Sequence, residues 1–204
     1  MMRTGRRVVL ATRNEGKLVE LRRILAGLDV DLLTAAELGL PEVDETGETF
    51  AQNALAKARS AAVASNLLAL ADDSGLVIDQ LEGRPGVRSA RFAGPGADDE
   101  ANLRLVLRQL SGLPGRSARF VCVAALVAPD GREWTTEGIL EGHIVDEPRG
   151  EGGFGYDPIF RPVGELRTTA EMSPAQKDAI SHRGRAFRAM RSVIVELLDP
   201  PNVG

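Results

Sequence analysis

The sequence contains few of the residues on which several common functions depend. Among its 204 residues are one cysteine, two histidines and only 4% aromatic residues. A single cysteine cannot form an internal disulfide, and Cys122 lies in the apolar run 120–128, which is typical of a buried strand and not of a nucleophile. No stretch has the roughly eighteen consecutive apolar residues of a membrane helix, and the apolar run at 8–12 is too short for a signal peptide. We therefore expect a cytoplasmic protein with no membrane partner.

Positive charge is not in excess either. The chain has 25 lysine and arginine residues against 29 aspartate and glutamate residues, which gives a formal net charge of −4. Proteins that coat DNA or RNA usually carry a basic excess, so we expect no nucleic-acid partner. The proportions of apolar residues (43%) and charged residues (26%) are typical of a globular protein, and the length suits one domain over residues 1–204. Any anionic ligand must therefore be bound by cations placed locally.

Strands and helices are expected to alternate through most of the chain. Apolar spacing and capping residues predict strands at 7–12, 30–33, 67–71 and 76–78, and helices at about 18–28, 50–65, 103–110, from 174 onward, and finally up to about 198. Thr49 with Gln52 forms a capping box for the second helix, and Asp98 is placed to cap the third. Residues 118–145, interrupted by the turn signal 129–131, predict an antiparallel hairpin. The sequence therefore predicts an α/β protein with a mixed sheet.

Residues 12–17 (Thr-Arg-Asn-Glu-Gly-Lys) lie where the first predicted strand leads into the first helix. Free backbone N–H groups at a helix N-terminus attract phosphate, so this turn with Lys17 is a candidate phosphate site. It is not a Walker A loop, because the glycine spacing is absent and Leu18 stands where that motif has its magnesium-binding serine or threonine. An ordinary capped turn with a solvated lysine would show the same pattern.

Two acidic pairs are candidates for binding a metal. Asp72-Asp73 begins a polar segment, 72–75, that we expect to separate two strands, and Asp44-Glu45 lies in a loop. Adjacent carboxylates after an apolar strand need a cation, a donor or water beside them. Carboxylates from separate segments often hold one Mg²⁺ beside substrate phosphates. Spacing alone does not distinguish such a site from turns or helix caps.

The C-terminal third offers groups that could recognise a base. The glycine-rich segment 152–158 contains Phe154 and Tyr156, two of the few aromatic rings, which suits a loop that places a ring against a base. Rings that fill the core beneath a glycine-rich turn are the alternative interpretation. Residues 181–183 (Ser-His-Arg) provide several hydrogen-bond donors, with Lys177 about one helical turn earlier. Solvated cations on a helix face would give the same pattern.

Taken together, these motifs resemble the inosine/xanthosine triphosphate pyrophosphatase family, also called Ham1-like or RdgB-like. The resemblance is carried, in order, by residues 9–17, 45–50, 53–54 with 57–58, 71–76, 85–94, 148–150, 153–160 and 181–184. It implies a two-lobed α/β fold around an elongated mixed β-sheet with flanking helices, the active site in the cleft, and a homodimer. It also implies Mg²⁺-dependent hydrolysis of dITP, ITP and XTP to a nucleoside monophosphate and pyrophosphate, which removes aberrant purines from the nucleotide pool.

The resemblance also implies roles for individual residues. The triphosphate would be bound by Thr12, Arg13, Asn14, Glu15, Gly16, Lys17 and Lys57. Glu45 and Asp73 would hold the metal, and Asp73 would act as general base with the catalytic residues Lys17 and Asp72 and the substrate-binding Ser74 beside it. The nucleoside would be contacted by Phe154, Gly155, Tyr156, Asp157, Lys177, His182 and Arg183.

Three positions depart from the family's commonest pattern. Asp44 stands where a second glutamate often occurs, so the pair does not show which carboxylate contacts the metal, and Arg88 and Phe92 stand where tyrosine is frequent.

Donors from His182, Arg183 or the backbone could select a 6-keto purine over adenine. Two other functions remain open: a related pyrophosphatase acting on modified pyrimidines or methylated bases, and a nucleotide-binding module without catalysis.

Overall fold

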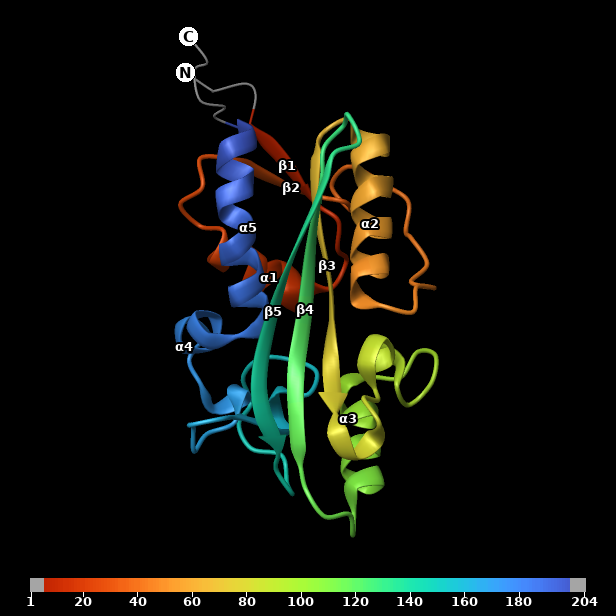
Figure 1. Ribbon diagram of the computed structural model, residues 1–204, viewed down its shortest axis with the longest axis vertical. Helices are drawn as coiled ribbons and strands as arrows, with labels where there is room; N and C mark the ends of the chain where they lie inside the picture. Colours follow the sequence, from red (N-terminus) through yellow and green to blue (C-terminus); the bar gives the residue numbers. More distant parts are fainter. Residues whose placement is uncertain (1–5, 199–204) are drawn as a thin grey trace. The chain divides into compact units, whose positions relative to one another are not determined.

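The computed structural model describes residues 6–198 as a mixed β-sheet with helices packed against it (Figure 1). In chain order the elements are β1 (Arg7–Leu10), α1 (Glu15–Ile24), β2 (Asp31–Thr34), α2 (Phe50–Ser65), β3 (Leu68–Ile78), α3 (Asp99–Leu110), β4 (Ser117–Val127), β5 (Glu133–Ile144), β6 (Phe160–Pro162), α4 (Pro174–Ile180) and α5 (His182–Leu198). Short 3₁₀ turns lie at Asp79–Leu81, Gly86–Arg91, Asp157–Ile159 and Thr169–Glu171. No helix within residues 6–198 combines the length and hydropathy needed to cross a membrane.

The sheet has the strand order β2-β1-β3-β4-β5-β6. β1 pairs in parallel with β2 and with β3, whereas β5 pairs antiparallel with β6. β4 and β5 are neighbours joined by a short turn in which Gly131 N donates to the Ala128 carbonyl at 2.9 Å. Both the mixed sheet and the hairpin predicted around residues 129–131 are therefore confirmed.

The helix boundaries follow local capping chemistry. Thr49 and Gln52 form the predicted capping box of α2, and Asp98 Oδ1 accepts from Ala101 N at 2.8 Å at the start of α3. Ser173 and Gln176 form a second capping box at the start of α4. These helices begin where the sequence predicted, because each cap is completed by residues only three positions apart.

One expectation about the fold is wrong. Residues 72–75 do not separate two strands, because β3 is continuous from Leu68 to Ile78 and carries Asp72 and Asp73 within it. β1 pairs with β3 only at residues 68–70, so beyond that point the other neighbouring strand, β4, is what continues the sheet beside β3. Membership of the sheet beside β4 therefore outweighs the local preference of Asp, Ser and Gly for a turn.

The chain divides into two compact units, and each has its own core. Unit 1 comprises residues 1–73, 123–137 and 185–204, of which 6–73, 123–137 and 185–198 are described, and unit 2 comprises residues 74–122 and 138–184. Unit 2 is built around a cluster that includes Leu76, Leu103, Val106, Phe120 and Phe160. The predicted burial of Cys122 is confirmed, since its exposed fraction is 0%.

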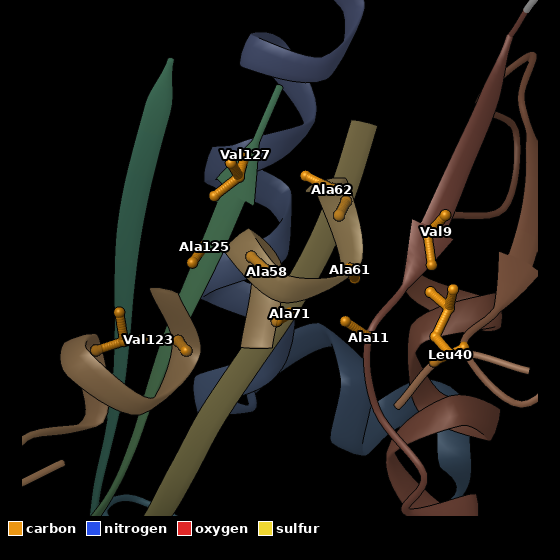
Figure 2. Close-up of a cluster of buried hydrophobic side chains, with 13 residues drawn as sticks. Val9, Ala11, Leu40, Ala58, Ala61, Ala62, Ala71, Val123, Ala125 and Val127 are labelled. Carbon is orange, nitrogen blue, oxygen red and sulfur yellow. The ribbon is translucent and has the colours of Figure 1, made fainter. Parts of the chain in front are cut away.

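The core of unit 1 is made largely of small side chains (Figure 2). Helix α2 contributes four alanines at helical spacing, Ala54, Ala58, Ala61 and Ala62, each at most 4% exposed. They pack against residues of β1, β3 and β4, among them Val9, Ala69, Ala71, Val123 and Ala125. Because both surfaces are alanine-rich, α2 lies close to the strands that it covers. Asn53 and Lys57, on the same helix, are thereby brought within reach of the sheet.

Candidate active site

The turn between β1 and α1 is organised by its own side chains. Asn14 caps the helix, since its Oδ1 accepts from Lys17 N at 2.9 Å, and Thr12 Oγ1 accepts from Asn14 N at 3.3 Å. Arg13 points elsewhere, because its Nη2 donates to the Leu40 carbonyl at 2.8 Å. Residues 15 and 16 form the first turn of α1, so backbone N–H groups remain at the end of the helix, where an anion is favoured.

Lys17 contacts the first of the two aspartates of β3. Its Nζ lies 3.1 Å from Asp72 Oδ2, and the side chains are 13% and 0% exposed. A carboxylate without access to water is costly unless a cation or donors compensate it. The pair therefore places a buried carboxylate directly beside the lysine predicted to bind phosphate.

Lys57 reaches from α2 to the loop before it and forms an ion pair with Glu45. Burial disfavours its charged form, but Asp72, Glu45 and Asp73 together outweigh this cost and raise the pKa of Lys57. Lys57 is therefore charged and has three carboxylates around it.

Asn53 connects Asp73 to the loop that carries Glu45. Its Nδ2 donates to Asp73 Oδ2 at 2.9 Å, and its Oδ1 accepts from Gly47 N at 2.8 Å. Asn53 is 1% exposed, and a Cβ at position 47 would lie only 2.6 Å from Asn53 Oδ1, so glycine is required there by close packing. The backbone two residues after Glu45 is thus tied to the same amide that holds Asp73.

Asp73 lies in a mixed electrostatic environment. Burial raises its pKa and Glu45 adds to this effect, while Lys57, Lys17 and the Asn53 hydrogen bond oppose it, and the net change is upward. Asp73 thus interacts with residues from three other parts of unit 1: α1, α2 and the loop before α2. A carboxylate with a raised pKa beside cations is typical of a functional site.

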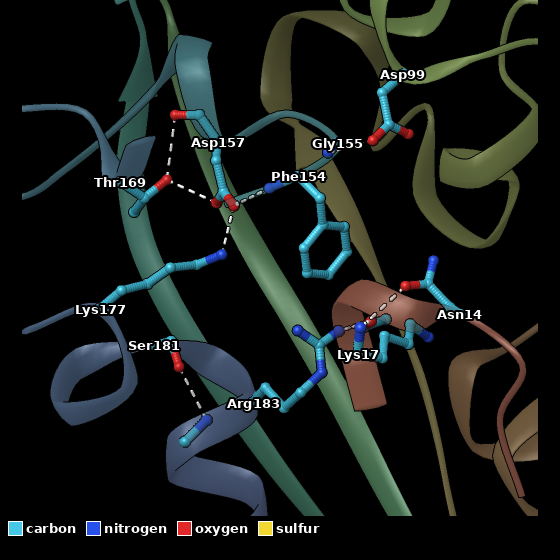
Figure 3. A network of polar contacts seen from close by, with 12 residues as sticks. Asn14, Lys17, Asp99, Phe154, Gly155, Asp157, Thr169, Lys177, Ser181 and Arg183 are labelled. Atoms are coloured by element: carbon cyan, nitrogen blue, oxygen red, sulfur yellow. Dashed lines mark hydrogen bonds and ion pairs between the residues drawn. The ribbon is translucent and has the colours of Figure 1, made fainter. Parts of the chain in front are cut away.

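Unit 2 contains a second polar network, centred on Asp157 (Figure 3). Its Oδ2 accepts from Phe154 N at 2.8 Å and forms an ion pair with Lys177, and its Oδ1 accepts from Thr169 Oγ1 at 2.7 Å. The side chains of Asp157 and Lys177 are 3% and 6% exposed. A side chain at position 153 would overlap Asp157 Oδ2, so Gly153 is required beside this carboxylate. The network fixes the backbone on which Phe154 is carried.

The ring of Phe154 has two cations near it. Lys177 Nζ lies 5.0 Å and Arg183 Cζ lies 5.6 Å from the ring centroid. Arg183 is 2% exposed, and its Nη2 donates to Ser74 Oγ at 2.7 Å. The ring can stack on a base, and the lysine and arginine, which are donors only, can donate hydrogen bonds to oxygen atoms of that base.

His182 and Tyr156 are held mainly by protein contacts. The His182 ring stacks on Phe120, with centroids 4.7 Å apart and an interplanar angle of 15°. Tyr156 is 5% exposed and donates its hydroxyl to the Ser89 carbonyl at 2.7 Å. The side chain of Tyr156 therefore fills the core of unit 2, as the alternative interpretation of the glycine-rich segment proposed.

The predicted residues thus form two groups, one in each unit. Unit 1 brings Lys17, Glu45, Lys57, Asp72 and Asp73 together, and unit 2 brings Ser74, Phe154, Asp157, Lys177 and Arg183 together. Three remaining candidates lie around the turn before α1: Arg13, Asn14 and Glu15 are exposed on the surface of unit 1. Asp44 is also exposed, Arg88 is exposed, and Phe92 packs against the core of unit 2.

Sequence reasoning did not identify two residues of these networks. Asn53 was noted only as part of a motif, although an amide placed one turn before Lys57 on the same helix face was a usable signal. Thr169 had no such signal, since its partner Asp157 lies 12 residues away and only the fold brings the two together.

Comparison with known proteins gives a consistent set of relatives. The sequence model of the Ham1 family matches residues 8–193. A dITP/XTP pyrophosphatase from Streptomyces coelicolor is 55% identical over 197 residues, which cover 94% of this chain and 98% of that protein. A solved HAM1 protein from Coxiella burnetii matches with a TM-score of 0.87 at 43% identity, covering 94% of this chain and all of that one. A nucleoside-triphosphatase / dITP/XTP pyrophosphatase from Mycobacterium abscessus matches with a TM-score of 0.73 at 49% identity, covering 90% and 98%.

Proposed function

Because this chain belongs to the Ham1 family, we propose that it hydrolyses the aberrant purine nucleotides dITP, ITP and XTP to a nucleoside monophosphate and pyrophosphate. The observation that carries this proposal is the gathering of two lysines and three carboxylates in unit 1. Cleaving a phosphoanhydride requires neutralised charge and an aligned water more than covalent catalysis. Lys17, Lys57 and the N-terminus of α1 supply cationic and N–H groups for a triphosphate.

The carboxylates fit a magnesium ion. Glu45 and Asp73 come from separate segments, and the charge of Glu45 is near enough to contribute to the raised pKa of Asp73. A cation bound between the two carboxylates would relieve this repulsion. Within residues 6–198 no group of three or more His, Cys, Asp or Glu side chains is arranged to hold a metal. Mg²⁺ commonly takes only one or two protein carboxylates and completes its coordination with water and substrate phosphates. When bound, it would neutralise charge on the phosphates.

Asp73 is the group we assign as general base. It would take a proton from a water molecule whose oxygen forms a bond to the α phosphorus while the bond between that phosphorus and the bridging oxygen breaks. Pyrophosphate then leaves with the electron pair of the broken bond, and the monophosphate keeps the water oxygen. Asn53 Nδ2 donates to Oδ2 of Asp73 and thereby orients the carboxylate. Lys17 and Asp72, which pair with each other, lie beside it.

Selectivity for the base is assigned to unit 2. Phe154 offers a ring for stacking, and Arg183 and Lys177 are donors that suit the 6-keto oxygen of inosine or xanthine. Adenine carries an amino group at that position and gains nothing from a donor. The same phosphate apparatus would serve a pyrophosphatase for modified pyrimidines or methylated bases, so only the base pocket separates the two functions.

A panel of nucleoside triphosphates tests the proposal. ITP, dITP, XTP, ATP, GTP and a modified pyrimidine triphosphate are incubated with the protein and Mg²⁺, and pyrophosphate and orthophosphate are measured separately. We expect pyrophosphate from the first three, and loss of the reaction when EDTA removes the metal. Stepwise release of orthophosphate would refute the cleavage position, preference for the pyrimidine would favour the rival enzyme, and binding without any product would favour the non-catalytic module.

We also propose that the protein is a homodimer in the cytoplasm, where the nucleotide pool lies. The dimer rests on the family resemblance alone. Sedimentation velocity at working concentrations is expected to give a species of twice the 21.8 kDa chain mass. A monomer at every concentration would refute the dimer without affecting the assigned chemistry.

A further inference from the structure

Helix α3 contacts the segment that carries Phe154, although the two are far apart in sequence. Gly155 N donates to Asp99 Oδ2 at 2.7 Å, across 56 residues, and both belong to unit 2 (Figure 3). A hydrogen bond to an ionised carboxylate is stronger than one between neutral groups. The contact is therefore a candidate for holding this segment in place.

The helix that supplies Asp99 is itself firmly fixed. Asp98 caps its first turn, and Leu103 and Val106 are buried in the core of unit 2. Asn102, one turn after Asp98, accepts from Ala93 N at 2.7 Å. Asp99 thus projects from a capped and packed first turn, which makes it a rigid anchor.

The backbone on both sides of the Phe154 Cα is held by a carboxylate. The N–H of Phe154, which precedes this atom, donates to Asp157, and the N–H of Gly155, which follows it, donates to Asp99. Gly155 has a φ of +62°, in the left-handed region that favours glycine. The two hydrogen bonds come from different elements and together fix where the Phe154 side chain leaves the backbone.

Asp99 is also close enough to the next residue, Tyr156, to interact with it electrostatically. Burial raises the pKa of Tyr156, and the negative charge of Asp99 raises it further. The Tyr156 hydroxyl donates to the Ser89 carbonyl, so residues 154–156 are each fixed by a different partner.

We propose that Asp99 is a positioning residue that fixes the Phe154 ring for stacking on the purine base. The inference rests on the proposed function, because Phe154 is assigned there to the base. Asp99 is assigned no contact with the base or the phosphates. Its effect passes through the Gly155 N–H, so its loss should weaken base binding and leave the cleavage step largely intact.

Amide hydrogen exchange provides a direct test that does not depend on activity. In Asp99→Ala, exchange at the Gly155 amide should become about tenfold faster or more, because its acceptor is gone. Asp99→Asn keeps a side-chain oxygen as acceptor and should restore most of the protection. Glu100→Ala is the matched control, since Glu100 lies in the same turn and pairs with the exposed Arg104 at 2.6 Å. Unchanged Gly155 exchange in Asp99→Ala would overturn the proposal.

Kinetics with ITP test the consequence for the base. Asp99→Ala should raise KM for ITP by about tenfold with less than about a twofold change in kcat, while Glu100→Ala should match the wild type. Faster exchange with an unchanged KM, or a fall in kcat alone, would overturn the positioning role. A wild-type protein that leaves ITP intact would instead refute the proposed function, and the exchange rates would still decide whether Asp99 holds the segment.

Discussion

Replacing Asn53 with leucine removes a side chain that hydrogen-bonds both to Asp73 and to the loop that carries Glu45. Leucine is similar in size, so the change deletes hydrogen bonds and leaves little empty volume. The bond from Asn53 Nδ2 to the Asp73 carboxylate involves a charged acceptor and is worth about 1.5–3 kcal/mol, and the bond from Gly47 N adds about 1 kcal/mol. We therefore expect a loss of about 2.5–4 kcal/mol in the free energy of unfolding, measured by urea titration.

The effect on catalysis should exceed the effect of destabilisation alone. If the Asp73 bond orients the carboxylate in the transition state, its 1.5–3 kcal/mol corresponds to a fall of about one to two orders of magnitude in kcat/KM for ITP. Gln52→Ala is the matched control, because Gln52 completes the capping box at the same helix end without contacting Asp73. The assay is pyrophosphate release at a temperature where both variants are folded. Activity in Asn53→Leu equal to that of Gln52→Ala would refute the assigned role of Asn53.

Three further variants probe the assigned roles. Asp73→Asn should abolish turnover with the fold retained, as shown by circular dichroism, because it removes both the base and a metal ligand; near wild-type turnover would show that the base is misassigned. Arg183→Ala should lower the ITP to ATP ratio of kcat/KM by about one to two orders of magnitude, and an equal slowing of both substrates would assign Arg183 to the scaffold. Lys177→Met leaves the buried Asp157 without its cation and should cost about 3–5 kcal/mol, or about 6–20 °C in Tm by calorimetry. Arg167→Met, at a half-exposed residue whose ion pair is open to solvent, should cost almost nothing.

Local chemistry explains which parts of the fold could be predicted. Helix α2 was predicted with its observed bounds because Thr49 and Gln52 are close in sequence and complete each other's cap. The hairpin of β4 and β5 followed from a turn signal flanked by apolar residues. The continuity of β3 through residues 72–75 could not be predicted, since it depends on the neighbouring strand β4, which is distant in sequence.

The types of residue in the candidate site could be predicted from the sequence, but which side chains contact one another could not. The acidic pair at 72–73 indicated a need for compensating groups, but Lys17 and Asn53 lie many positions away, and only the fold brings them to these carboxylates. For Tyr156, the sequence pattern could not show how the side chain is buried. Its position in a glycine-rich segment suggested a ligand contact, whereas the side chain is buried and bonded to Ser89.

The alanine surface of α2 sets the distance between that helix and Asp73, the carboxylate that we propose as general base. Asn53 has a short side chain, so its 2.9 Å bond to Asp73 exists only while the helix lies close to the sheet. Ala54 and Ala58 are fully buried and face the strands, with no space for a longer side chain. A larger residue at Ala58 would move the helix outward and separate Asn53 from Asp73. The range of residues tolerated in this part of the core is therefore limited by chemistry as well as by packing.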